Sequence, residues 1–264
     1  MYRIIALDID GTLLNDDHRL TDATRRSVRE AHDRGADIVL CTGRGPANAV
    51  PIMEQLGLEG TVITHNGGVT IEWPDNVVVN QFTFSLATVH PLIDYARRKR
   101  LHVDVCTAFE LFIERCDTEA ARMYRDFLLS PTKVSDLKAL ETSIVKLTLF
   151  GPPERLDQVE SDWPDLNIPL RLIRSGAKFI DIMLLEASKG AALRHLAGRL
   201  GVERGEILAM GNFYNDMEMI EYAGMGIAMA NSPEAVIASA DEVTLSNNED
   251  GVAHALRKYV LTKS

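Results

Sequence analysis

The stretch Ile4-Ile5-Ala6-Leu7-Asp8-Ile9-Asp10-Gly11-Thr12-Leu13 begins as an apolar run and ends in two carboxylates, a glycine and a hydroxyl. A short apolar run bounded by a turn signal predicts a strand buried on both faces of a sheet. Open α/β sheets place their ligands at the carboxyl ends of such strands. We therefore expect Asp8 and Asp10 to lie at the mouth of a parallel sheet.

Only one residue separates Asp8 from Asp10, so their negative charges repel each other unless a cation or a shared proton compensates them. Hard divalent cations prefer oxygen ligands, and the pair therefore predicts a Mg²⁺ site. The alternative is a plain strand-ending turn, because Asp and Gly are ordinary turn residues. The rest of the chain decides between these interpretations.

The composition is that of a globular protein and limits its possible partners. The length of 264 residues favours about two domains. The content of 46% hydrophobic and 25% charged residues is typical of a globular protein. The net charge of −10 argues against nucleic acid or an anionic membrane as a partner. The three cysteines have no metal-type spacing, no apolar run approaches about 18 residues, and we expect no signal peptide before the first strand. We expect a cytoplasmic protein, and no motif specifies its oligomeric state.

A second polar cluster follows the next predicted strand. A helix over 21–34, with Thr21 as its N-cap, leads into the apolar run 36–41, and strand–helix–strand predicts a parallel crossover. Thr42, Gly43 and Arg44 come directly after it. The Thr42 hydroxyl and the Gly43 N–H suit phosphate oxygens, and Arg44 suits an anionic substrate. Alone, these three residues are more typical of a plain turn.

The middle of the chain predicts a hairpin and then an inserted domain. Residues 69–72 and 77–80 should form a hairpin that leaves the sheet, and His65 before it is expected to be an ordinary loop histidine. From about residue 83 amphipathic helices mix with alternating strands, which predicts an α+β cap with helices on one face of its sheet. We expect a discontinuous Rossmann-like α/β core over 1–83 and 186–264, and a cap over 84–185.

Two further motifs follow the cap. Ser188 is suited to N-cap a helix over 190–200, which places Lys189 among free N–H groups where a phosphate is favoured. The apolar run 207–211 predicts another buried strand, followed by Asn212-Phe213-Tyr214-Asn215-Asp216.

The stretch Asp8-Ile9-Asp10-Gly11-Thr12-Leu13 resembles the first motif of the haloacid dehalogenase-like phosphatases. Thr42-Gly43-Arg44, Lys189 and the segment 212–216 resemble the second, third and fourth motifs, and the size and position of the cap resemble the Cof-type branch. This resemblance implies a phosphatase in which Asp8 is the nucleophile, forming an aspartyl-phosphate, and Asp10 the acid/base. It implies Mg²⁺ as the cofactor, a small phosphorylated metabolite such as a sugar phosphate as the substrate, and a closing cap that excludes water. The implied phosphate- or substrate-binding residues are Thr42, Gly43, Arg44, Lys189 and Asn215. The implied metal ligands are Asp8, the Asp10 backbone carbonyl, Asn212 and Asp216.

Asn212 departs from the family pattern, which has Asp at this position. An amide oxygen can take the same place at a similar distance, but the site then has one negative charge fewer. We expect weaker Mg²⁺ binding, or a more direct contribution from Asp216. Two other functions stay open: a phosphomutase on the same fold, and a non-catalytic ligand-binding protein with a weakened metal site.

Overall fold

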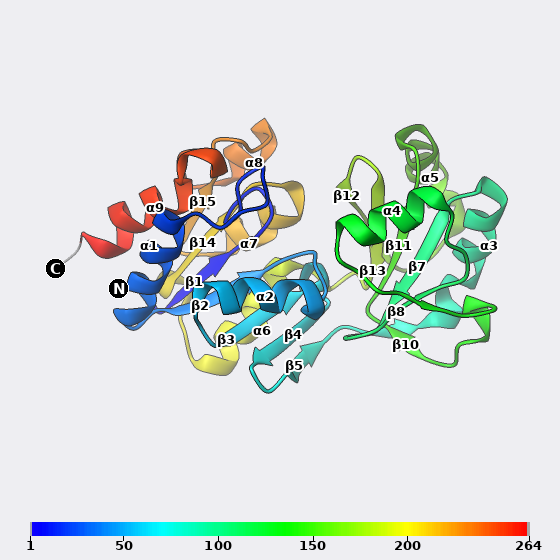
Figure 1. Ribbon diagram of the computed structural model, residues 1–264, viewed down its shortest axis with the longest axis horizontal. Helices are drawn as coiled ribbons and strands as arrows, with labels where there is room; N and C mark the ends of the chain where they lie inside the picture. The colour runs from blue at the N-terminus through cyan, green and yellow to red at the C-terminus, as the bar shows by residue number, and fades with distance from the viewer. Residues whose placement is uncertain (1, 263–264) are drawn as a thin grey trace. The chain divides into compact units, whose positions relative to one another are not determined.

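The apolar run at the start of the chain forms strand β1 (Ile4–Leu7), whose four side chains are all completely buried. Its two neighbours, β14 (Ile207–Gly211) and β2 (Asp37–Cys41), pair with it in parallel. All three strands consist largely of apolar residues, as expected of strands covered on both faces. β1 is thus an interior strand of a mainly parallel sheet (Figure 1).

The computed structural model describes residues 2–262 and separates the chain into two units. The first, here called the core unit, runs up to Asn80 and resumes at Ser188, and the second, the cap unit, comprises Gln81–Ala187. The core sheet has the strand order β16-β15-β14-β1-β2-β3-β4-β5. Its remaining strands are β3 (Gly60–Thr64), β4 (Val69–Trp73), β5 (Val77–Gln81), β15 (Met225–Ala228) and β16 (Glu242–Val243).

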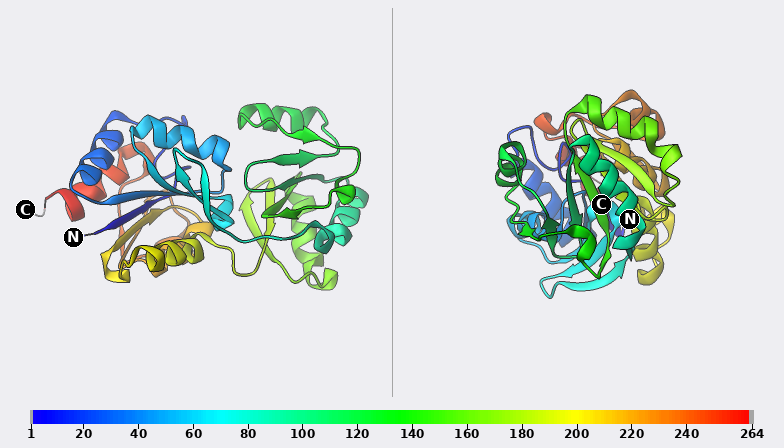
Figure 2. Two further views of the ribbon diagram at one scale, coloured as in Figure 1. Left: turned by 90° about the horizontal axis from the view of Figure 1, so that it is seen from below. Right: turned by 90° about the vertical axis from the view of Figure 1, so that its right-hand side faces the viewer.

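Helices cover both faces of the core sheet. Helices α1, α2 and α9 lie on one face, and α6 and α7 on the other (Figure 2). Apolar side chains of α6 and α7 pack on β1, β2 and β14. The core helices are α1 (Asp22–Asp33), α2 (Pro46–Leu56), α6 (Lys189–Leu200), α7 (Met217–Tyr222), α8 (Glu234–Ser239) and α9 (Gly251–Leu256). The prediction of a Rossmann-like α/β core is confirmed.

The two helix starts predicted from capping residues are also confirmed. The Thr21 side chain accepts the backbone N–H of Thr24 at 3.1 Å and starts α1. The Ser188 side chain accepts the N–H of Ala191 at 3.0 Å and makes Lys189 the first residue of α6. A side-chain oxygen at this position satisfies a backbone donor that the helix itself leaves unpaired.

The predicted hairpin over 69–80 exists, but the expectation that it leaves the sheet is wrong. Strand β4 pairs antiparallel with β3 over its whole length and extends the core sheet, with β5 as the edge strand. Val69 and Ile71 are completely buried and Thr70 is 2% exposed, so β4 is covered on both faces. A hairpin standing away from the sheet would have left one of these faces in water.

The cap unit contains a six-stranded sheet of order β12-β13-β11-β7-β8-β9 and a short pair, β6 with β10. Helices α3 and α5 pack on one face of the larger sheet, and α4 covers part of the opposite face. The prediction that helices cover only one face of the cap sheet is therefore wrong. The cap helices are α3 (His90–Lys99), α4 (Thr118–Asp126) and α5 (Pro153–Leu166). The cap strands are β6 (Phe84–Ser85), β7 (His102–Cys106), β8 (Leu111–Ile113), β9 (Thr132–Lys133), β10 (Ser143–Ile144), β11 (Lys146–Phe150), β12 (Arg171–Gly176) and β13 (Phe179–Met183). Within residues 2–262, none of the helices combines the length and the apolar character that crossing a membrane demands.

Candidate active site

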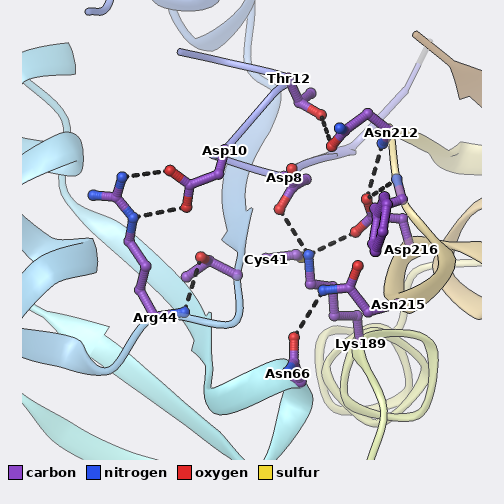
Figure 3. A network of polar contacts seen from close by, with 12 residues as sticks. Asp8, Asp10, Thr12, Cys41, Arg44, Asn66, Lys189, Asn212, Asn215 and Asp216 are labelled. Carbon is purple, nitrogen blue, oxygen red and sulfur yellow. Dashed lines mark hydrogen bonds and ion pairs between the residues drawn. The ribbon is translucent and has the colours of Figure 1, made fainter. Parts of the chain in front are cut away.

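The carboxyl ends of four neighbouring strands meet at one edge of the core sheet. β14, β1, β2 and β3 are consecutive and parallel, so the loops that follow them lie together. Figure 3 shows the resulting network of polar contacts, to which α6 adds Lys189 from below the sheet edge. The structure brings all nine predicted site residues to this edge: Asp8, Asp10, Thr42, Gly43, Arg44, Lys189, Asn212, Asn215 and Asp216.

Lys189 is the centre of the network. Its Nζ donates to Asp8 Oδ1 at 2.7 Å and to Asp216 Oδ1 at 2.6 Å, and its side chain is completely buried. Burial lowers the pKa of Lys189, but the two carboxylates outweigh burial and leave that pKa above its ordinary value. Burial and the nearby Asp216 carboxylate raise the pKa of Asp8 to about 7, although Lys189 acts in the opposite direction. The lysine therefore favours the anionic form of Asp8, which a nucleophile requires.

Both carboxylate oxygens of Asp216 accept hydrogen bonds from groups of the core unit. Oδ1 accepts from Lys189, and Oδ2 accepts the backbone N–H groups of Asn212 and Phe213 at 2.9 and 3.0 Å. Such an arrangement closes the turn after β14 and fixes the lysine at the same time. In this geometry Asp216 orients Lys189 and Asn212.

A cluster of oxygen atoms lies beside Asp8. Thr12 Oγ1 donates to Asn212 Oδ1 at 3.2 Å (Figure 3). The position of Asn212 Oδ1 lies 2.9 Å from the Asp10 carbonyl oxygen and 3.1 Å from Asp8 Oδ2. Carboxylate, carbonyl and amide oxygens are the ligands that Mg²⁺ prefers, so Asp8, the Asp10 carbonyl and Asn212 fit this ion. No group of three His, Cys, Asp or Glu side chains suited to a metal exists in the described part of the chain.

Gly11 lets the Asn212 side chain approach this closely. Gly11 has a φ of +77°, and a Cβ at this position would lie 2.4 Å from Asn212 Nδ2. Any other residue would be strained and would push the amide away. The Asn231 side chain donates to the Gly11 carbonyl at 2.9 Å and holds the turn from the far side.

The Asp10 side chain points away from Asp8 and toward Arg44. Arg44 Nε donates to Asp10 Oδ2 at 2.8 Å, and Nη2 donates to Oδ1 at 2.5 Å, which is a two-pronged ion pair (Figure 3). The Asp10 side chain keeps 46% of its surface exposed, so its oxygens are open to solvent. The sequence predicted Arg44 as a partner of an anionic substrate, and here its partner is the predicted acid/base.

Thr42 and Gly43 follow β2 directly. Thr42 is 1% exposed, its N–H donates to the Ile63 carbonyl at 2.8 Å, and its Oγ1 accepts the N–H of Arg44 at 3.1 Å. These contacts fix the hydroxyl at the sheet edge. A polar group held in this way suits a phosphate oxygen without reorganisation.

Sequence reasoning missed Asn66, which follows β3 and is 1% exposed. Its Oδ1 accepts Asn215 Nδ2 at 2.9 Å, and its N–H donates to the Thr42 carbonyl at 2.9 Å. A Cβ at Gly43 would lie 2.9 Å from Asn66 Oδ1, so the side chain is packed against Gly43. Asn66 thus links the loops after β2 and β14. In the sequence the pair Asn66-Gly67 is typical of an ordinary turn.

The His65–Gly67 turn is itself pressed against the start of α6. His65, Asn66 and Gly67 have φ values of +50°, +54° and +93°. A Cβ at Gly67 would lie 2.1 Å from the Ser188 carbonyl oxygen, which requires glycine there. His65, expected as an ordinary loop residue, is 5% exposed, and its N–H donates to the Arg44 carbonyl at 2.8 Å.

Comparison with known proteins places this chain in one family. Residues 5–256 match the model of the haloacid dehalogenase-like hydrolases. YxeH of Bacillus subtilis is 35% identical over 271 residues with both chains covered completely. The 5-amino-6-(5-phospho-D-ribitylamino)uracil phosphatase YcsE of the same organism is 31% identical, covering 98% of this chain and 96% of its own.

Solved structures agree with the sequence relatives. A haloacid dehalogenase-like hydrolase from Bacteroides thetaiotaomicron superimposes with a TM-score of 0.88 at 29% identity, over 98% of this chain and 99% of its own. A protein from Thermotoga maritima gives a TM-score of 0.85 at 28% identity, over 98% and 97%. The match therefore extends over both units, and the chain belongs to the haloacid dehalogenase-like hydrolase family.

Proposed function

We propose that this protein is a Mg²⁺-dependent phosphatase that hydrolyses small phosphate monoesters through an aspartyl-phosphate on Asp8. The observation that carries the proposal is the Asp8 carboxylate at the sheet edge, with Oδ1 on Lys189 and Oδ2 facing the Asn212 amide. Carboxylates in such positions are known nucleophiles of phosphoryl transfer. Relatives named as phosphatases, including one for phosphoglycolate from Methanoculleus marisnigri, support a small phosphorylated substrate.

In the first step an Asp8 oxygen forms a bond to phosphorus while the bond from phosphorus to the ester oxygen breaks. Asp10 gives its proton to the departing alcohol oxygen, and Arg44 holds the Asp10 carboxyl in place through two hydrogen bonds. Lys189 and Thr42 bind the equatorial oxygens of the phosphoryl group as its charge spreads over them.

In the second step Asp10 takes a proton from a water molecule, whose oxygen attacks the phosphorus of the aspartyl-phosphate. The bond from phosphorus to Asp8 breaks, which releases inorganic phosphate and restores the carboxylate. A bound Mg²⁺, held by Asp8, the Asp10 carbonyl and Asn212, would supply charge neutralisation at the phosphoryl oxygens. Asp216, whose oxygens both accept protein donors, would act by orienting Lys189 and Asn212.

The test is hydrolysis of an aryl phosphate and of a panel of phosphorylated sugars and metabolites, with MgCl₂ and with EDTA. We expect Mg²⁺-stimulated release of inorganic phosphate, and a loss of at least about a thousandfold in Asp8→Asn. Asp33→Asn, which alters an exposed carboxylate at the end of α1, is the matched control. Turnover by Asp8→Asn near that of the wild type would refute the nucleophile, and an isomerised ester in place of free phosphate would indicate a mutase.

A further inference from the structure

The loop between β1 and α1 carries Asp10, the acid/base of the proposed function. Its first turn is closed by the backbone: the Leu14 N–H donates to the Ile9 carbonyl at 2.9 Å, and Leu14 forms a β-bridge with Asp10. Two carbonyl groups of this turn, those of Gly11 and Leu14, accept hydrogen bonds from side chains 220 and 233 residues further along the chain. These distant side chains therefore act on the backbone to which the Asp10 carboxyl is attached.

The two donors are Asn231 and Asn247, here called the carboxamide pair. Asn231 Nδ2 donates to the Gly11 carbonyl at 2.9 Å, and Asn247 Nδ2 donates to the Leu14 carbonyl at 3.1 Å. Asn231 Oδ1 also accepts the backbone N–H of Asn247 at 3.1 Å, which joins the two residues. Asn247 is 5% exposed, so its hydrogen bonds face little competition from water. The turn from Gly11 to Leu14 is thus held at both ends by one connected group.

The C-terminal segment also holds the loop beyond this turn. Asn247 Nδ2 donates to Asp16 Oδ1 at 3.0 Å, and Asn248 Nδ2 donates to Asp16 Oδ2 at 2.8 Å. In return, the Asp16 N–H donates to Asn248 Oδ1 at 3.0 Å. The hydrogen bonds from Asn247 and Asn248 favour the carboxylate and lower the pKa of Asp16. The loop cannot shift as a whole without breaking these contacts.

Asp8 is held by different contacts. Its N–H donates to the Met210 carbonyl at 3.0 Å, which continues the pairing of β1 with β14, and its Oδ1 accepts from Lys189 at 2.7 Å. The sheet and the lysine therefore hold Asp8, whereas the carboxamide pair holds the turn that carries Asp10. A change in the pair should disturb Asp10 before it disturbs Asp8.

We propose that Asn231 and Asn247 are positioning residues of the reaction, which keep the Asp10 carboxyl where it can give its proton to the departing alcohol. The inference rests on the proposed function, in which Asp10 is the general acid. Such an acid must lie within hydrogen-bond reach of the oxygen that it protonates, so a displaced turn slows the steps that need this proton. Arg44 orients the same carboxyl through its side chain, while the carboxamide pair acts through the backbone.

The leaving group distinguishes a displaced acid from general damage to the site. A 4-nitrophenolate leaves without a proton, whereas the alkoxide of a sugar phosphate needs one, so only the second substrate depends strongly on Asp10. The test compares kcat/KM for 4-nitrophenyl phosphate with kcat/KM for the sugar phosphate that the wild type hydrolyses fastest, at saturating MgCl₂. Because kcat/KM covers only the steps up to release of the alcohol, hydrolysis of the aspartyl-phosphate, which both substrates share, does not contribute.

We expect Asn231→Ala and Asn247→Asp to lower kcat/KM for the sugar phosphate about tenfold or more, and for 4-nitrophenyl phosphate about twofold at most. Both values come from the same preparation, so their ratio does not depend on how much of a variant is folded. Asn231 is exposed, so Asn231→Ala should also fold well. Asn76→Gly, which removes an exposed carboxamide from the turn between β4 and β5, is the matched control and should leave the ratio unchanged.

An unchanged ratio in Asn231→Ala and Asn247→Asp, whether both substrates slow equally or neither slows, would overturn the proposal. Asp10→Asn, which removes the acid itself, should lower the ratio further, and an equal loss for both substrates in this variant would refute the acid role of Asp10 in the proposed function instead. A wild type that hydrolyses neither substrate would refute the proposed function, and the positioning role with it.

Discussion

The ammonium group of Lys189 lies 2.7 Å from the Asp8 carboxylate, and the two side chains are 0% and 7% exposed. The same ammonium contacts Asp216 at 2.6 Å, so one buried cation is shared by two buried carboxylates. Removing one member of a buried ionic group leaves the others without compensation, which costs about 3–5 kcal/mol. We therefore predict that Lys189→Met lowers the free energy of unfolding by about this amount and abolishes hydrolysis. Urea denaturation and a phosphate-release assay measure the two effects.

The double variant Lys189→Met with Asp216→Asn separates the structural role of the lysine from its catalytic role. Neutralising Asp216 removes one of the two charges left unpaired, so part of the lost stability should return. Hydrolysis should stay absent, since no cationic side chain then faces the phosphoryl group. A double variant no more stable than Lys189→Met would show that the ionic group is not what destabilises the single variant.

Arg44 holds Asp10 with two nitrogen atoms, and a lysine cannot reproduce this fork. The pair is too exposed to add more than about 1 kcal/mol to stability, so its effect should lie in orientation. We predict that Arg44→Lys lowers kcat roughly tenfold or more and leaves the Tm unchanged. Steady-state kinetics and thermal unfolding check this, with Arg25→Lys, whose arginine pairs with Asp22 on the surface of α1, as the control.

The alternative role of Arg44, as a direct partner of the substrate anion, gives a different result. In that case the change to lysine would raise KM and leave kcat near its wild-type value. The split between kcat and KM therefore decides which of the two contacts matters for turnover.

The strand ends at the site could be predicted because their signals are local. Asp8, Thr42 and Asn212 each follow an apolar run, and in a parallel sheet such ends share an edge whatever the details of packing. The capping hydroxyls of Thr21 and Ser188 act on donors three residues away, so the starts of α1 and α6 are visible in the sequence.

The features that were missed depend on distant partners. The hairpin over 69–80 carries its own turn signals, but its pairing with β3 is a choice among all free sheet edges, which no local pattern encodes. Asn66 has the same sequence signature as an exposed Asn-Gly turn, and its importance comes from Asn215, which lies 149 residues along the chain. The sequence shows that Arg44 is a cation after β2, but its ion pair with Asp10 could be recognised only once the strand ends were placed together in the fold.

Asn66 has a natural control in Asn76. Both residues have a φ of +54°, but Asn66 is buried in the site and Asn76 is exposed in the turn between β4 and β5. Glycine adopts this φ without strain, so Asn→Gly removes only the side chain. We predict that Asn66→Gly lowers kcat roughly tenfold, because Asn215 and the Thr42–Gly43 loop lose the group that links them, and that Asn76→Gly has no effect. Equal kinetics for the two variants would contradict a positioning role of Asn66.

A second buried group of charges lies within the cap unit, on strands β7, β11 and β13. Lys146 Nζ lies 3.4 Å from Asp181 Oδ1, and the Tyr124 hydroxyl donates to Asp104 Oδ2 at 3.1 Å. Burial raises the pKa of Asp104 to about 6, with Asp181 acting in the same direction and Lys146 against it. A carboxyl whose pKa is higher in the folded state than in the unfolded chain holds its proton longer when folded. Its ionisation therefore destabilises the cap as the pH rises.

The pH window of this effect follows from the two pKa values, the ordinary 3.8 and about 6 in the folded state. Below the lower value Asp104 is protonated in both states and does not affect stability, while above the upper value the full penalty, on the order of 3 kcal/mol, applies. We predict that Asp104→Asn becomes more stable relative to the wild type by about this amount between pH 4 and pH 7.5. Urea unfolding in a Trp73→Phe background, where Trp163 of the cap core is the remaining tryptophan, reports on the cap unit. Asp126→Asn, at the exposed end of α4, should show no such change, and an equal pH response of the two variants would rule out burial of Asp104 as the cause.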